Sequence, residues 1–134
     1  MSVEQNKVLV GREQGELWNH TGNLDAAAEL FAAGEVEAAK QEAADFRRGF
    51  PDVISTIEDL IAEEDKVVAR WRSRATHRGD YMGIPPSGKE VQFTGISFYL
   101  IEEGKIAESW TEEDQFGLMR QIGAIRESGQ AQGA

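Results

Sequence analysis

Apolar and polar side chains alternate along most of residues 66–114, KVVARWRSRATHRGDYMGIPPSGKEVQFTGISFYLIEEGKIAESWTEED, and this segment carries the strongest indication of the fold. Alternation with a period of two is typical of a β-strand that has one face on a core. From Val67 the odd positions are mostly apolar and end at His77, whereas arginines occupy the even positions 70, 72, 74 and 78. The odd positions therefore predict the core face, with His77 at its far end.

The alternation predicts a meander of strands over residues 53–62, 67–77, 91–101 and 105–114. The first of these strands has aliphatic residues at both its even and its odd positions, so we expect both of its faces to be partly covered. Residues 63–65 and Glu103-Gly104 read as tight turns, and the breakers in 79–88 predict a loop. Gly95 inside the third strand suggests a bulge or bend.

Residues 1–50 read as helical, with Ser2 and Asn23 as caps of the first two helices, Gly34 as the stop of the second, and Pro51 as the end of a third. Helices followed by a strand meander indicate an α+β fold, one curved antiparallel sheet with helices on one face. We expect a single domain over residues 1–134. It would consist of a helical part (1–50), a sheet (51–114), a short C-terminal helix (115–123) and a tail (124–134).

Composition excludes several classes of function. The formal net charge of −10 disfavours nucleic acid and anionic membrane surfaces as partners. The chain has no cysteine, and its two histidines, His20 and His77, lack metal-ligand spacing, so no metal site is expected. No apolar run approaches the roughly 20 residues of a membrane span, and no signal segment is evident, so a cytoplasmic protein is expected.

Two side chains are the candidates for chemistry. Asp114 shares its parity with Ile106 and Trp110, and a carboxyl group beside an indole would have a raised pKa suited to proton transfer. The alternative is that Asp114 only caps the helix that follows. His77 could donate a hydrogen bond to a substrate carbonyl or relay a proton, or it could simply bond a backbone carbonyl at a strand end.

Five apolar or aromatic residues are candidates for substrate binding. Trp71 and Trp110 could line a hydrophobic pocket, although such residues are more often core. Tyr81, Met82 and Ile84 lie in the predicted loop, which could fold back as a lid over a cavity.

Several segments together resemble the SnoaL-like polyketide cyclase family of the nuclear transport factor superfamily. They are VARWRSRATHRG (68–79), GIPPSGK (83–89), GKIAESWTEED (104–114) and the glycines 117 and 123 with their apolar neighbours. The resemblance implies a cone-shaped sheet with helices over its concave face and an apolar cavity inside. It also implies that an aspartate near the end of the last long strand, here Asp114, is the acid/base of an intramolecular aldol ring closure without metal or cofactor. His77 would help to polarise the substrate carbonyl.

One departure from the family pattern concerns residues 31–50, which lack the usual short strand and form a shortened segment, so we expect one cavity wall to be reduced. The leading expectation is a cofactor-independent cyclase acting on a hydrophobic carbonyl compound. Alternatives are a non-catalytic module that binds a small apolar ligand or assembles through its sheet, and a hydratase, dehydratase or isomerase on the same scaffold. A homodimer is expected because the sheet's outer face is partly apolar.

Overall fold

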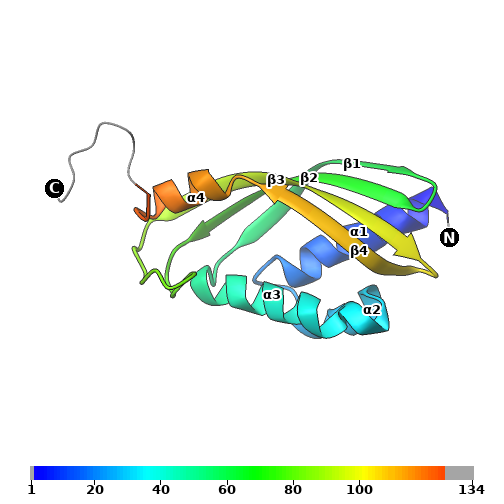
Figure 1. Cartoon of the computed structure of the whole chain (residues 1–134), viewed down its shortest axis with the longest axis horizontal. Coiled ribbons are helices and arrows are strands. Elements are labelled where there is room, and N and C mark those ends of the chain that lie inside the picture. Colours follow the sequence, from blue (N-terminus) through cyan, green and yellow to red (C-terminus); the bar gives the residue numbers. More distant parts are fainter. Residues whose placement is uncertain (1, 126–134) are drawn as a thin grey trace.

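The computed structural model describes residues 2–125. Its helical elements are α1 (Val3–Leu17), a 3₁₀ turn η1 (Leu24–Ala26), α2 (Ala27–Leu30), a second turn η2 (Ala33–Glu35), α3 (Val36–Gly49) and α4 (Gln115–Gln121). The strands are β1 (Ile54–Glu63), β2 (Lys66–Thr76), β3 (Glu90–Glu102) and β4 (Lys105–Glu113). They form one antiparallel sheet in the order β1-β2-β3-β4, and α1 to α3 lie on one side of it (Figure 1). The α+β fold with a curved, unclosed sheet is therefore confirmed.

The first helix begins where the sequence predicts. Ser2 accepts a hydrogen bond from the Gln5 backbone N–H, and the Gln5 side chain accepts one from the Ser2 N–H, which together form a capping box. One side of α1 is buried, at residues 6, 9, 10, 13, 14 and 17. This stripe has helical spacing and faces the sheet.

The predicted second helix is short, because the chain leaves it for the sheet. α2 ends at Leu30, before the predicted stop at Gly34, and Phe31 is extended and forms a parallel bridge to Ile106. The Ala32 N–H donates to the Ile106 carbonyl at 2.9 Å. In place of the short strand expected to be missing after Phe31, the chain forms this single bridge, and the turn η2 then leads into α3.

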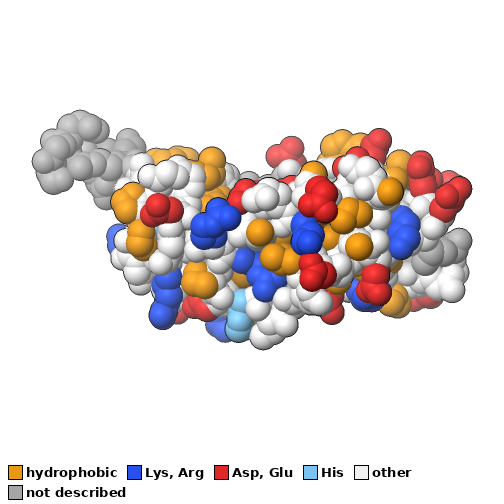
Figure 2. All heavy atoms as spheres, turned by 90° about the horizontal axis from the view of Figure 1, so that it is seen from below, with side chains coloured by type: hydrophobic (Ala, Val, Ile, Leu, Met, Phe, Trp, Pro, Cys, Tyr) orange, Lys and Arg blue, Asp and Glu red, His pale blue; other side chains and the backbone are white. Residues whose placement is uncertain are grey.

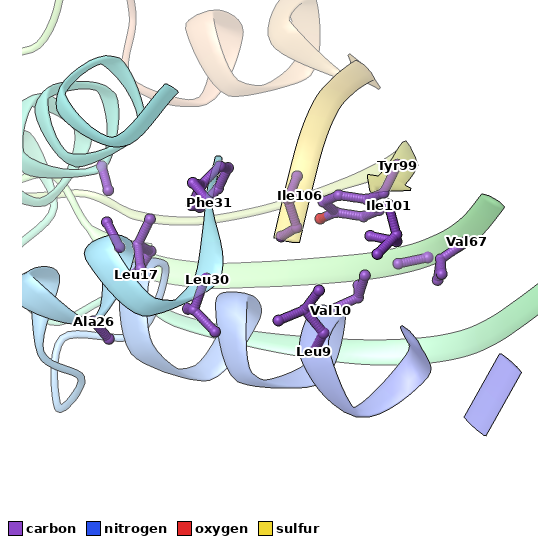
Figure 3. Packing of buried hydrophobic residues seen from close by; sticks show 13 residues of the cluster. Leu9, Val10, Leu17, Ala26, Leu30, Phe31, Val67, Tyr99, Ile101 and Ile106 are labelled. Carbon is purple, nitrogen blue, oxygen red and sulfur yellow. The ribbon is translucent and has the colours of Figure 1, made fainter. Parts of the chain in front are cut away.

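Hydrophobic packing joins the helices to the concave face of the sheet. The odd positions of β2 are buried as predicted, and His77 beyond them is fully buried. Figure 3 shows Leu9 and Val10 of α1 facing Val67, Ile101 and Ile106 of the strands, with the Tyr99 ring beside them. A second cluster, near the other end of the sheet, is built from Phe50, Val53, Trp71, Ala75, Val91, Phe93, Leu118 and Ile122.

The bulge of the sheet is not at Gly95. β2 and β3 stay in register past Gly95, which lies opposite Trp71. A Cβ there would meet the Trp71 indole closer than 3.0 Å, so Gly95 leaves room for that ring. One irregularity falls instead between β1 and β2, where Glu58 is extra. Another lies between β3 and β4, where Ile101 pairs with Ile106 but Leu100 pairs with Glu108, so that Ala107 is extra.

This extra residue changes which side chains of β4 face the helices. Beyond Ala107, β4 pairs Ser109 with Tyr99 and Thr111 with Ser97, so the odd residues share the inner face. Trp110 lies opposite Phe98 on the outer face. The predicted common face of Ile106, Trp110 and Asp114 is therefore wrong, since one inserted residue reverses the alternation.

β1 is an edge strand and is less covered than predicted. Of its residues only Ser55 is buried, and Ile54 and Ile61 are 46% and 61% exposed. On the face of the molecule that Figure 2 shows, basic and acidic side chains are interspersed with apolar ones. Within residues 2–125, no helix is long and apolar enough to cross a membrane.

Candidate functional site

A cavity of about 930 Å³ lies between the concave face of the sheet, α1 and α3. Its wall is partly aromatic. These side chains come from the C-cap of α1, the segment after α2, α3, the loop after β2, and the strands: Trp18, Phe31, Phe46, Trp71, Tyr81, Phe93, Tyr99 and Trp110. α3 supplies one side of the cavity, and the expected reduction of that wall stays a prediction. A cavity of this size can enclose a small organic molecule.

Hydroxyl groups line the sheet side of the cavity. Ser73 donates to Ser55 at 3.1 Å across β1 and β2, and the Ser97 and Thr111 hydroxyls are 2.8 Å apart across β3 and β4. Between these pairs, the Trp71 indole N–H donates to Ser97 at 2.9 Å. The floor of the cavity is therefore polar although its sides are aromatic.

Glu13 is the buried carboxyl group of this cavity. It is only 4% exposed, and its oxygens accept hydrogen bonds from the Trp18 Nε1–H at 2.7 Å and the Tyr99 hydroxyl at 3.0 Å. Burial raises the pKa of Glu13 from 4.5 to about 7, although both hydrogen bonds act in the opposite direction. Burial, together with the charge of Glu13, raises the pKa of Tyr99 well above its usual value, so that phenol stays a donor.

Other carboxylates stand around the cavity. Glu113, beyond the bulge, has a raised pKa because it is partly desolvated and because Glu42 of α3 adds a like charge. Arg48 also lines the cavity, but its guanidinium pairs with Asp45 at 3.0 Å. The remaining acidic lining residues are Glu35, Asp80 and Glu108.

Two of the predicted lid residues reach the cavity. Tyr81 and Met82 both line it, and the Tyr81 ring contacts Phe46 and Phe50 edge-on at 5.8 and 5.0 Å. The Gln115 amide donates to the Tyr81 hydroxyl at 3.0 Å. Burial raises the pKa of Tyr81, so its hydroxyl stays protonated. Ile84 packs against the second hydrophobic cluster and is not part of the lining.

His77 lies behind the aromatic wall rather than on the cavity surface. Its ring stacks on Phe50 at 5.3 Å, and its Nδ1 accepts from the Ser87 backbone N–H at 3.1 Å. In the neutral ring the proton is then on Nε2, which is buried without a hydrogen-bond partner among the described residues. A catalytic role for His77 stays a prediction.

Asp114 is the N-cap of α4. Its Oδ1 accepts from the Gly117 backbone N–H at 2.9 Å, and its side chain is exposed and does not line the cavity. The capping alternative thus has a direct hydrogen bond in its favour, and the catalytic role stays a prediction. The structure does not bring Asp114 and His77 together on the cavity surface.

The two tryptophans differ in their surroundings. Trp71 is buried and lines the cavity, whereas Trp110 is 52% exposed and borders the cavity while its ring packs edge-on against Phe98 at 5.7 Å.

The sequence patterns did not identify Glu13, Glu113 and Phe46 as site residues. The sequence does indicate that Glu13 is buried, because this residue lies four positions after Leu9 and four before Leu17 on the apolar stripe of α1.

These features, a curved sheet over an aromatic cavity with buried carboxyl and hydroxyl groups, define an α+β protein with a cavity on the concave side of its sheet. The family model for SnoaL-like polyketide cyclases matches residues 9–122, and the chain belongs to this family. No functionally curated protein matches the chain.

Solved structures agree with the family. TsrD from Streptomyces laurentii is similar with a TM-score of 0.86 and 26% identity, over 93% of this chain and 99% of TsrD. A protein from Jannaschia sp. CCS1 assigned to the SnoaL-like polyketide cyclases has a TM-score of 0.84 and 26% identity, over 92% and 94% of the two chains. One from Acidithiobacillus ferrooxidans assigned to the polyketide cyclases has a TM-score of 0.78 and 27% identity, over 91% and 97%.

Proposed function

We propose that the protein is a cofactor-independent cyclase that closes a ring in a hydrophobic, carbonyl-bearing molecule held in the cone. The observation that carries this proposal is the cavity itself, which combines aromatic walls with a buried carboxyl group of raised pKa. Aromatic walls suit an apolar substrate, and a carboxyl group with a pKa near neutrality suits proton transfer. Family membership supports the same reaction class.

The chemistry is an intramolecular aldol addition. A base removes the proton next to one carbonyl, the resulting enolate carbon attacks a second carbonyl, and the new alkoxide takes up a proton. The reaction needs no oxidant or reductant. The Tyr81 hydroxyl is a suitable donor to the enolate oxygen, because its proton is retained at neutral pH and would leave only a long 3.4 Å hydrogen bond to the Gln115 side-chain oxygen, while its own oxygen accepts from the Gln115 amide at 3.0 Å.

The test is conversion of a panel of aromatic diketones and β-ketoesters, followed by mass spectrometry and by deuterium uptake next to the carbonyl in heavy water. A cyclase should yield ring products of equal mass, or of that mass less one water. If the protein retains such compounds unchanged and catalyses no deuterium uptake, it is a binding module and the cyclase proposal is wrong. The exposed position of Asp114 is the observation that favours this second candidate.

We also propose that two copies associate through the outer face of the sheet. Ile96, Phe98 and Trp110 are 50%, 37% and 52% exposed there and form an apolar patch. Light scattering should give twice the monomer mass, and Trp110→Glu should reduce it, because a charge would then be buried in the interface.

A further inference from the structure

Ion pairing does not explain why the carboxyl group of Glu13 is buried. The side chain comes from the buried stripe of α1 and points toward the sheet at the cavity. Among the described residues, no lysine or arginine forms a salt bridge with it, and its two hydrogen-bond donors, Trp18 and Tyr99, are neutral. A buried carboxyl group without a cation is costly, and a glutamine of the same shape would avoid that cost.

The two hydrogen bonds of Glu13 fix the orientation of its carboxylate but leave part of its hydrogen-bond acceptor capacity unused. Each carboxylate oxygen accepts one bond, one from Trp18 and one from Tyr99. A carboxylate has about four lone-pair sites, so roughly one site on each oxygen remains for a proton. The group is therefore held in place and open to a molecule in the cavity.

A chain of hydroxyl groups leads away from Glu13 across the sheet. Tyr99 donates to Glu13 and also contacts the Ser97 hydroxyl, which lies 2.8 Å from Thr111. Thr111 is exposed. These residues hold Glu13 and connect it toward solvent, so Tyr99 is a positioning residue in this arrangement.

We propose that Glu13 is the catalytic residue that removes and returns the substrate proton in this cavity. The C–H bond next to the carbonyl breaks, its proton moves to a Glu13 oxygen, and the electron pair enters the enolate. The enolate carbon forms the new C–C bond, and Glu13 gives its proton to the alkoxide. This assignment rests on the proposed cyclase function.

The charged groups that face the cavity set the conditions of this step. Glu13 must be ionised to accept a proton, and the charge of Glu42 acts against ionisation. The other charged or titratable side chains around the cavity are Glu35, Asp45, Arg48, Asp80, Tyr81, Tyr99, Glu108 and Glu113. The rate should accordingly rise with pH through an apparent pKa of about 7.

The test is deuterium uptake by 1-phenylhexane-1,5-dione in heavy water, measured for the wild type, Glu13→Gln and Glu37→Gln. Glu37 lies on the exposed side of α3 and is the matched control. Glu13→Gln should lower the uptake rate by about 10² to 10⁴, while the dione binds within a few-fold of its wild-type affinity. Glu37→Gln should leave both unchanged.

Two further variants separate catalysis from folding. Glu13→Asp, which keeps a carboxyl group, should recover part of the rate with a changed pH midpoint. Tyr99→Phe should raise the midpoint, because the lost donor favoured the ionised form. If Glu13→Gln exchanges within threefold of the wild type, or if neither variant moves the midpoint, the assignment is wrong and the proposed function stands. If the wild type itself gives no uptake above buffer, both fail.

Discussion

Replacing Glu13 with glutamine should change how the free energy of unfolding depends on pH. In the native protein burial raises the pKa of Glu13 from 4.5 to about 7. The folded state therefore binds this proton more tightly than the unfolded chain. The associated stability is fully present below about pH 4.5 and is lost as pH rises through about 7.

The magnitude follows from the two pKa values. At about 1.36 kcal/mol per unit, the full difference is about 3 kcal/mol, of which about 2 kcal/mol falls between pH 5.5 and 7.5. Glutamine cannot ionise, so the stability of the Glu13→Gln variant does not fall in this way as the pH rises. The free energy of unfolding of the wild type, minus that of Glu13→Gln, should therefore be lower at pH 7.5 than at pH 5.5 by about 2 kcal/mol.

The assay is urea unfolding of both proteins at the two pH values, followed by tryptophan fluorescence and circular dichroism. Unchanged m-values would show that only stability has changed. Glu37→Gln, which removes an exposed carboxylate, should show no comparable difference. A gap between wild type and Glu13→Gln that is the same at both pH values, within about 0.5 kcal/mol, would refute the reasoning about a buried, proton-binding Glu13.

Three further substitutions test the fold and the alternative site. Gly95→Ala should destabilise by about 1–3 kcal/mol in urea unfolding, because the new Cβ crowds Trp71, whereas Gly34→Ala, which meets no neighbour within 4 Å, should not. Asp114→Ala should lower the free energy of unfolding by about 1 kcal/mol because the α4 cap is lost, whereas Asp114→Asn should keep the cap and the stability. Diketone turnover by Asp114→Asn should stay near that of the wild type. A loss of about 10² in its turnover would return the acid/base role to Asp114. Ser2→Ala should cost about 1 kcal/mol by thermal unfolding, and no change would contradict the capping box.

The fold was predictable where one local pattern decided it. The alternation of β2 placed Val67, Trp71 and His77 on the buried face, and the structure agrees. β4 was not predictable in the same way, because the insertion at Ala107 is defined only by pairing with β3. No local propensity marks such a residue, and one position of slip reverses every side chain beyond it.

The site was only partly predictable for a related reason. Trp71, Tyr81 and Met82 line the cavity as expected, and Trp110 lines its border. A polar residue on an apolar helix stripe, such as Glu13, could have been singled out, but its partner Tyr99 is 86 residues away along the chain. Contacts of that range arise from the tertiary fold, and sequence spacing does not encode them.

The bulge lets β4 carry one residue more than its partner strand while the inner surface of the cavity stays the same. Deleting Ala107 would only close the bulge, because Ile106 and Glu108 would still pair with Ile101 and Leu100 and the residues beyond would keep their faces. Deleting a residue beyond the bulge, such as Ser109, would instead turn Trp110 and Glu112 inward and Thr111 and Glu113 outward without any substitution. In this architecture a single codon loss between the bulge and α4 is therefore a larger step in substrate preference than most point mutations, and relatives that differ in length there should differ in what they bind.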